Sequence, residues 1–307
     1  MGEGVEVWCG GVNTWECDEM GHLNVRFWVV KALEALAGLA RELGMPRAFA
    51  PDAGATLAVR ELHMRFLKEA HPGASLYADG GVIEIGEDDA RLLILIRHPD
   101  RTPAATFQVL VTHATSQDLR PFPWPQRVRA RAEALKMEVP AFAAARSINL
   151  SPVEVTASLA RAEALNLQRI GLSVVGPTDL DVFGRMRPEV FIGRVSDGVA
   201  RLFERDPPPQ SPGGDEPRIG GAVLEYRLVF AGWPRAGDGV EVRSGFASCA
   251  PRTRRVFHWM VDPDSGRPWV SSEAVVISFD LDKRKVVDLT PEAQARFEAR
   301  IAPGLTY

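Results

Sequence analysis

The sequence has few cysteines, and they follow no recognisable pattern. Cys9, Cys17 and Cys249 are the only three among 307 residues. Because the number is odd and the spacing is not that of a metal-binding motif, the sequence predicts neither a disulfide framework nor a cysteine metal site. A reducing cytoplasm is the simplest setting for these thiols.

An excess of positive charge and long apolar runs are also missing. With a net charge of −4 and no dense basic cluster, the chain is not expected to bind nucleic acid or a membrane surface. The longest apolar runs are too short to span a bilayer, and the N-terminus has no signal-peptide pattern. The composition is that of a globular protein, with 46% hydrophobic and 25% charged residues. The length suffices for two domains or one large one.

The most informative stretch runs from Asp18 into a long helix predicted over residues 23–43. Apolar residues cover nearly the whole circumference of this helix, which predicts that other structure surrounds it. Asn24 is predicted to cap it, so unpaired N–H groups beginning at Val25 would point toward Asp18. A carboxylate beside unpaired amides at a buried helix start suits acyl chemistry. Nearly all the polar residues of the helix fall on one narrow stripe: Asn24, Lys31, Glu34, Arg41 and Glu42.

The same stretch has the pattern Asp-x-x-Gly-His-x-Asn, from Asp18 to Asn24. It resembles the 4-hydroxybenzoyl-CoA thioesterase family of hotdog-fold enzymes, and it is similar to the Asp…His…Asn segment of acyl-ACP thioesterases. The resemblance is specific over residues 18–44 and looser beyond them. It implies a curved antiparallel sheet wrapped around one central helix. It also implies catalytic roles for Asp18, His22 and Asn24, and a Val25 amide that polarises the thioester carbonyl.

The pattern of strands and helices occurs twice along the chain. Short turns between consecutive strands after the first helix predict an antiparallel meander. In the second half, Asp181 matches Asp18 at a spacing of 163 residues, and a helix is predicted over 188–204. This spacing is right for duplicated domains. The predicted strands are 55–69, 75–85, 91–98 and 104–115 in the first half, and 167–175, 222–231, 240–250, 253–261 and 269–280 in the second.

We therefore predict an α+β protein with a double hotdog fold, in which two antiparallel sheets each wrap a central helix. The predicted domains are an N-terminal hotdog at 1–118, a linker at 119–166 and a C-terminal hotdog at 167–307. Within the linker, Ser151-Pro-Val-Glu154 has the pattern of a helix start.

The two halves differ at the helix start. Val25 in the first half has a backbone N–H, whereas Pro188 at the matching position has none. The first half is therefore predicted to be active and the second to be a degenerate partner, with Asp181 kept as a lower-ranked candidate. The second half also lacks two polar motif residues, since Arg185 replaces His22 and Arg187 replaces Asn24.

The predicted function is hydrolysis of the thioester of an acyl-CoA or an acyl-ACP. Asp18 would act as general base or as nucleophile, and the sequence leaves this choice open. His22 or Asn24 would orient the water or the carboxylate. Coenzyme A enters as part of the substrate, and no other cofactor and no metal is expected. Lower-ranked candidates for substrate binding are His63, Arg65 and Glu69.

Other interpretations stay open. One is a non-catalytic hotdog protein that binds an acyl thioester. Another is a hotdog enoyl hydratase or dehydratase, which would need its own Asp/His arrangement on the central helix, and we find no second such pair there. Taken singly, Asp18 is typical of a turn, and His22 and Asn24 of packing and capping. The acyl chain, the association into homo-oligomers and the activity of the second half are not determined by the sequence.

Overall fold

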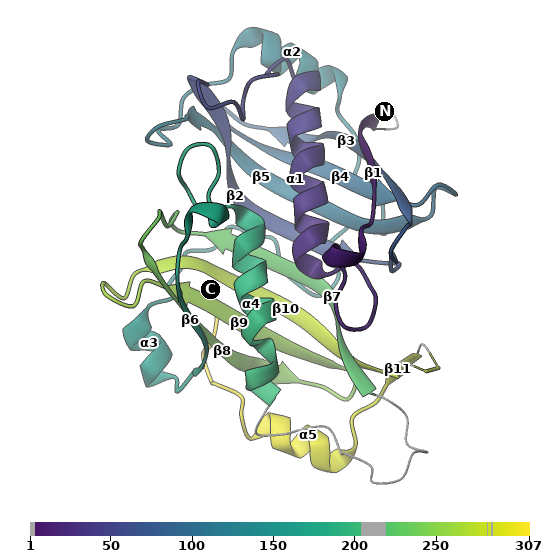
Figure 1. The fold of residues 1–307 in the computed structure, drawn as a ribbon, viewed down its shortest axis with the longest axis vertical. Coiled ribbons are helices and arrows are strands. Elements are labelled where there is room, and N and C mark those ends of the chain that lie inside the picture. Colours follow the sequence, from purple (N-terminus) through teal and green to yellow (C-terminus); the bar gives the residue numbers. More distant parts are fainter. Residues whose placement is uncertain (1–3, 204–218, 281, 284) are drawn as a thin grey trace. The chain divides into compact units, whose positions relative to one another are not determined.

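The computed structural model describes residues 4–203, 219–280, 282–283 and 285–307 (Figure 1). The chain divides into two compact units. One comprises Met1–Ala145 with Thr178–Ile192, and the other comprises Arg146–Pro177 with Gly193–Tyr307. The domain boundaries that the sequence predicts at residues 118 and 166 remain a prediction. No helix in the described ranges is long and apolar enough to cross a membrane.

The first sheet is antiparallel, with a three-strand meander in its middle and one further strand on each side of it. Its strand order is β1-β3-β4-β5-β2, and α1 (Val25–Glu42) lies across it (Figure 1). Short turns join β3 to β4 and β4 to β5, as the sequence predicted. The predicted four-strand meander is wrong at its first strand, because β2 pairs with β5 and not with β3. The strands are β1 (Val5–Gly11), β2 (Ala55–Phe66), β3 (Ser75–Ile85), β4 (Asp89–Arg97) and β5 (Pro103–Thr115).

The helix α1 packs closely on the edge strand through Gly38. A Cβ at this position would lie 2.1 Å from the carbonyl oxygen of Val7, so only glycine permits the approach. In the second repeat, Gly198 meets Ile170 in the same way, with a distance of 2.3 Å to the carbonyl oxygen. In each repeat, a glycine thus lets the central helix pack closely against the edge strand.

Lys31 departs from the simple polar stripe predicted for this helix. Lys31 is only 4% exposed. Its Nζ donates hydrogen bonds to Glu16 Oε1 at 2.9 Å and to the Gly11 carbonyl oxygen at 2.9 Å. The helical period groups Lys31 with the polar residues, but it cannot show that a buried carboxylate lies opposite. A buried charge is tolerated here because it is paired and hydrogen-bonded.

The second sheet repeats the first. Its strand order is β7-β10-β9-β8-β6, with β11 paired to β10, and this is the same connectivity strand for strand. The helix α4 (Pro188–Phe203) occupies the place of α1 in the chain order. The strands are β6 (Gln168–Val174), β7 (Ile219–Phe230), β8 (Gly239–Cys249), β9 (Thr253–Val261), β10 (Pro268–Asp280) and β11 (Lys285–Val287).

The helix start predicted at Ser151 is wrong. Ser151 instead hydrogen-bonds to Asn149, whose Oδ1 accepts from the Ser151 N–H at 2.9 Å and from its Oγ at 2.8 Å. This local side-chain turn competes with a helix. The helix of this region, α3 (Leu159–Ala164), begins later and is capped by Ser158.

Two further helices lie outside the two repeated patterns. One is α2 (Gln126–Ala134), which falls in the Arg- and Ala-rich part of the predicted linker. The other is α5 (Pro291–Glu298), which our strand and helix assignment omitted. Its signal was present in the sequence, because Thr290 caps the helix and Pro291 is its first residue.

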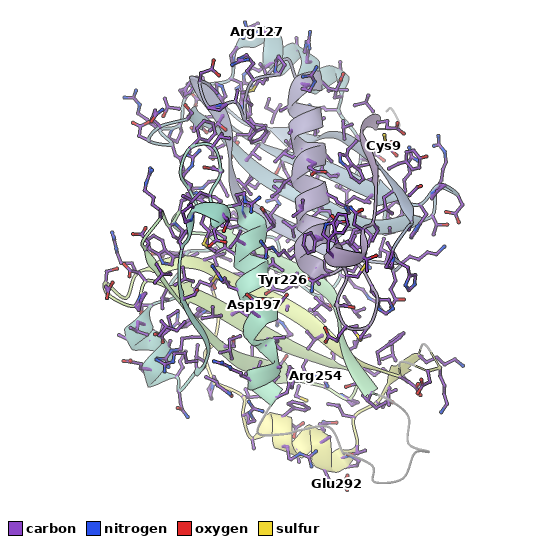
Figure 2. The ribbon with its side chains drawn as sticks, in the orientation of Figure 1. Cys9, Arg127, Asp197, Tyr226, Arg254 and Glu292 are labelled. Carbon is purple, nitrogen blue, oxygen red and sulfur yellow. The ribbon has the colours of Figure 1, made fainter. Side chains whose placement is uncertain are left out.

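Cys9, Cys17 and Cys249 are free cysteines. Cys9 is exposed on β1, where Figure 2 labels it. Cys249 ends β8, and burial raises the pKa of its thiol.

Candidate active site

The loop before α1 holds the Asp18 carboxylate by one oxygen. Asp18 Oδ1 accepts hydrogen bonds from the N–H groups of Met20, at 2.9 Å, and His22, at 3.1 Å. The Asp18 N–H donates to the His22 carbonyl at 2.9 Å, which closes the loop. Gly21 allows this turn because its φ of 77° is unfavourable for other residues. In the described part of the chain, Oδ2 has no hydrogen-bond partner, so this oxygen can meet a substrate or a water.

The start of α1 returns to the same loop. The Asn24 N–H donates to the Glu16 carbonyl at 2.9 Å, so the first turn of the helix lies beside residues 16–18. Asn24 caps the helix, and its Oδ1 accepts from the Arg26 N–H at 2.9 Å. Val25 is the first helical residue, and within the described ranges its N–H has no acceptor. An unpaired amide at a helix start attracts negative charge, as an oxyanion site requires.

Glu16 anchors this loop, although the sequence reasoning overlooked it. Its Oε2 accepts from the Asn13 N–H at 2.8 Å, and Asn13 and Glu16 form a capping box around the short helix η1 (Thr14–Glu16). Its carboxylate also binds the buried Lys31. The pattern Asn-x-x-Glu at residues 13–16 was the available signal. Through Lys31, the central helix is tied to the loop that carries Asp18.

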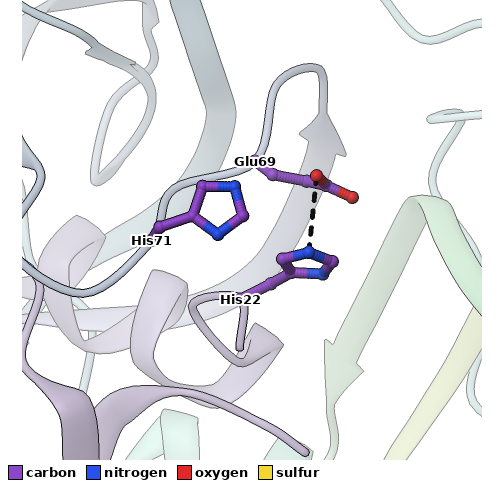
Figure 3. A group of neighbouring side chains, drawn as sticks. All are labelled: His22, Glu69 and His71. Atoms are coloured by element: carbon purple, nitrogen blue, oxygen red, sulfur yellow. Dashed lines mark ion pairs between the residues drawn. The ribbon is translucent and has the colours of Figure 1, made fainter. Parts of the chain in front are cut away.

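The structure brings His22 and Glu69 together, 47 residues apart in the chain. His22 Nε2 lies 3.5 Å from Glu69 Oε2. His71 completes the group: its ring meets that of His22 edge to face at 4.9 Å between centroids, and its Nδ1 lies 3.1 Å from the Gly21 carbonyl oxygen. Figure 3 shows the three side chains converging. Of the lower-ranked candidates, Glu69 thus lies beside the motif.

The other two lower-ranked candidates are Arg65, which contacts residues of the predicted linker, and His63. Arg65 Nη1 donates to the carbonyls of Phe142, at 2.8 Å, and Ala144, at 3.0 Å. His63 is buried on the same face of β2, two residues before Arg65. The segment that covers this face lies in the predicted linker, whose path the sequence pattern could not show. Substrate binding by His63 and Arg65 stays a prediction.

Cys17 adjoins Asp18, but its environment does not favour a nucleophile. Burial, followed by the neighbouring Asp18 carboxylate, raises the pKa of the Cys17 thiol. Its Sγ lies 3.5 Å from the Asn13 carbonyl oxygen. A reactive cysteine needs the opposite shift, because the thiolate is the attacking form.

The second repeat has the same turn around Asp181, but an arginine replaces the histidine. Asp181 Oδ1 accepts from the N–H groups of Phe183, at 2.8 Å, and Arg185, at 2.9 Å, which matches the bonds of Asp18 Oδ1. Its other oxygen, Oδ2, lies 3.4 Å from the Arg185 Nε. The arginine that replaces His22 therefore pairs with the carboxylate oxygen that is open in Asp18.

The helix start of the second repeat is also unsuited to an oxyanion. α4 begins at Pro188, which has no N–H to donate. The next residue, Glu189, is buried, and that burial raises the pKa of its carboxyl group. When ionised, this side chain occupies the region of the helix start that favours anions. Glu189 was not singled out from the sequence.

Comparison with known proteins decides the family. A model of the thioesterase-like superfamily matches residues 12–132 and 175–297, which is most of the chain and covers both repeats. The chain belongs to this thioesterase-like superfamily. It is accordingly a thioester hydrolase, and the predicted enzyme class is confirmed. None of the curated proteins compared with it matches in sequence.

Solved structures of thioesterases share the fold. An acyl-ACP thioesterase from Bacteroides thetaiotaomicron superposes with a TM-score of 0.65 at 9% identity, covering 88% of this chain and 96% of that one. The 12:0-ACP thioesterase from Umbellularia californica gives a TM-score of 0.63 at 11% identity, covering 88% and 93%. The α+β double hotdog prediction is confirmed.

This thioesterase also contains a buried serine–histidine pair that the sequence reasoning missed. Ser244 Oγ lies 2.7 Å from His258 Nδ1, between β8 and β9, and the Ser272 hydroxyl donates to the His258 carbonyl at 2.9 Å. Burial lowers the pKa of His258 to about 3. A histidine with so low a pKa is a weak base at neutral pH, so the pair is better explained as a structural element of the second sheet.

The pH dependence of stability tests this burial. Because the folded pKa of His258 is below its usual 6.5, the unfolded chain binds the proton first as the pH falls. As the pH falls from about 6 to about 3, His258 should therefore lower the free energy of unfolding by about 1 kcal/mol per pH unit. Urea unfolding of the native protein and of His258→Gln, measured across this range, should show the shallower pH profile for the variant. Parallel profiles would contradict a buried, neutral His258.

Proposed function

We propose that this thioesterase hydrolyses an acyl thioester at the Asp18 loop of the first repeat. The observation that carries the proposal is the difference between the two aspartates. Asp18 and Asp181 are held by equivalent backbone bonds through Oδ1, but Oδ2 is paired with a guanidinium only at Asp181. A carboxylate that is fixed by one oxygen and open at the other is oriented for chemistry.

The chemical steps follow from this arrangement. The thioester carbonyl oxygen would accept a hydrogen bond from the Val25 N–H. This bond would stabilise the negative charge that develops on that oxygen. Asp18 would take a proton from water as the water oxygen attacks the carbonyl carbon, or would itself attack to form a mixed anhydride. Collapse of the tetrahedral intermediate breaks the carbon–sulfur bond. On the general-base route, the departing thiolate takes the proton that Asp18 accepted, and the acid and the thiol are the products. On the mixed-anhydride route, the thiolate takes a proton from water, and a water molecule then hydrolyses the anhydride to release the acid and restore Asp18.

His22 has a supporting role in this proposal. Its backbone N–H holds Asp18 Oδ1 at 3.1 Å, and its ring faces Glu69. The ring would orient the attacking water or the departing thiol. Asn24 is already engaged as the helix cap through its Oδ1, so its contribution would be to hold the Val25 amide in place.

The substrate class is an acyl group on coenzyme A or on acyl carrier protein. Support comes from the superfamily and from the two solved structures above, which are described as acyl-ACP thioesterases. No cofactor is needed beyond the coenzyme A or carrier protein that forms part of the substrate. The free thiols favour a reducing cytoplasm as the place of action.

Thiol release from a panel of acyl thioesters tests the activity. We expect the protein to liberate free thiol from acyl-CoAs or acyl-ACPs of at least one chain length, followed with a thiol reagent. The reason is that the start of α1, where Val25 lies, is bonded to the loop that carries Asp18. An enoyl hydratase would change the acyl chain without releasing thiol. A binding protein would retain the intact thioester. Absence of thiol release across both carriers would contradict the proposed function.

A further inference from the structure

We infer that His22, Glu69 and His71 form a binding site for a transition-metal ion of the Zn²⁺ type. One donor atom from each of the three residues lies within 4.8 Å of the other two. Two imidazole nitrogens and one carboxylate oxygen are a donor set that zinc accepts while keeping a fourth position open to water. Mg²⁺ and Ca²⁺ prefer oxygen ligands, so the donor set selects against them.

The distance between His22 and Glu69 suits a shared ion. Zinc binds imidazole nitrogen and carboxylate oxygen at about 2.0–2.2 Å, so a tetrahedral ion separates two donor atoms by about 3.4 Å. The observed separation of His22 Nε2 and Glu69 Oε2 is 3.5 Å, which is longer than an ordinary N–H···O hydrogen bond. Small rotations of the partly exposed Glu69 and the exposed His71 would close the triad around an ion.

The hydrogen bond of His71 prepares it as a ligand. Its Nδ1 lies 3.1 Å from the Gly21 carbonyl oxygen. A carbonyl can only accept, so Nδ1 carries the proton, and in the neutral ring the lone pair is on Nε2. Metal-binding histidines usually have their second nitrogen bonded to a carbonyl or carboxylate in this way. Figure 3 shows the His71 ring turned toward Glu69.

The backbone brings the ligands together before any ion binds. The Leu23 N–H donates to the Ala70 carbonyl at 2.8 Å, so the residue after His22 is tied to the residue between the other two ligands. The Gly21–His71 bond adds a second tie one residue before His22. Little conformational freedom would therefore be lost on binding. A surface cavity of about 550 Å³, which Glu69 and His71 help to line, gives an ion and its water access.

The second repeat provides an internal comparison. Gly73 and Gly237 occupy the same turn, since their N–H groups donate to the Val12 and Val175 carbonyls and both have positive φ. Counting back from Gly237 puts Trp233 and Arg235 at the positions of Glu69 and His71, and Arg185 replaces His22. None of these three side chains is a metal ligand. Among the described residues, the donor set therefore belongs to the first repeat alone, together with the open Asp18 carboxylate.

Metal titration of the full-length protein tests the site. After treatment with a chelator, the protein should bind one equivalent of Zn²⁺ by isothermal titration calorimetry. With Co²⁺ as probe, it should develop visible d–d absorption that Zn²⁺ abolishes. Glu69→Gln and His71→Ala should each weaken binding by about 100-fold or more, which exceeds the loss from changing a residue outside the ligand set. Both residues are partly or fully exposed, so circular dichroism should show unaltered folding.

Two control variants separate this site from adventitious binding. Cys17→Ser should retain the affinity for Zn²⁺, because the free thiol is outside the triad. His98→Asn should also retain it, although His98 lines the same cavity. Absence of stoichiometric binding, or binding that survives both Glu69→Gln and His71→Ala, would overturn the inference. Because these readouts need no substrate, they succeed or fail independently of the proposed hydrolysis.

Discussion

Replacing Asp18 by asparagine should reduce thioester hydrolysis by about 10²- to 10⁴-fold, the usual loss when a positioned base is removed. Asparagine keeps an Oδ1 that can accept the same two backbone bonds, from Met20 and His22, so the loop should retain its shape. What disappears is the negative charge on Oδ2, for which the described residues provide no hydrogen-bond donor. Steady-state kinetics with the best thioester of the panel would measure the loss, and circular dichroism would confirm that the variant folds.

Asp181→Asn is the matched control, because the second repeat offers the same turn with a different environment. Its Oδ2 is paired with Arg185, and α4 begins at Pro188 without an N–H donor. We expect little change in rate. Equal losses in the two variants would mean that both repeats are active, and a large loss in Asp181→Asn alone would mean that the repeats are assigned the wrong way round.

Replacing Lys31 by methionine should reduce the free energy of unfolding by about 3–5 kcal/mol. The substitution conserves much of the side-chain volume but leaves the Glu16 carboxylate buried without its cation. That carboxylate also receives the Asn13 N–H, so it cannot move to solvent without breaking the capping box. Denaturant unfolding at neutral pH would measure the change.

Two comparison variants show whether the unpaired charge is the cause. Arg41→Met changes an exposed cation on the same helix and should cost about 0.5 kcal/mol or less. In the double variant Glu16→Gln with Lys31→Met, the buried charge is gone while the glutamine oxygen can still accept from Asn13. Part of the stability should return. A loss of under about 1 kcal/mol in Lys31→Met would show that Glu16 reaches water after all.

Local features of the sequence determined the architecture. Turn residues such as Gly73, together with runs of apolar residues, predicted the strand and helix order of both repeats, because these preferences act within a few neighbouring residues. The spacing of Asp18 and Asp181 revealed the duplication, and the pattern Asp-x-x-Gly-His-x-Asn pointed to the helix start. The contrast between Val25 and Pro188 needed no structure either, since proline lacks an N–H in any context.

Tertiary structure alone decided which distant side chains meet. The helical period does not show that Lys31 bonds to Glu16. The strand pattern does not show that Arg65 donates to the carbonyls of Phe142 and Ala144. The convergence of His22 with Glu69 and His71, and the pairing of Arg185 with Asp181, depend on backbone paths and rotamers. Sequence patterns record which face a residue occupies, whereas the partner on that face is set by how separate elements pack. For this reason the fold and the motif were predictable, and the donor triad and the blocked second aspartate were not.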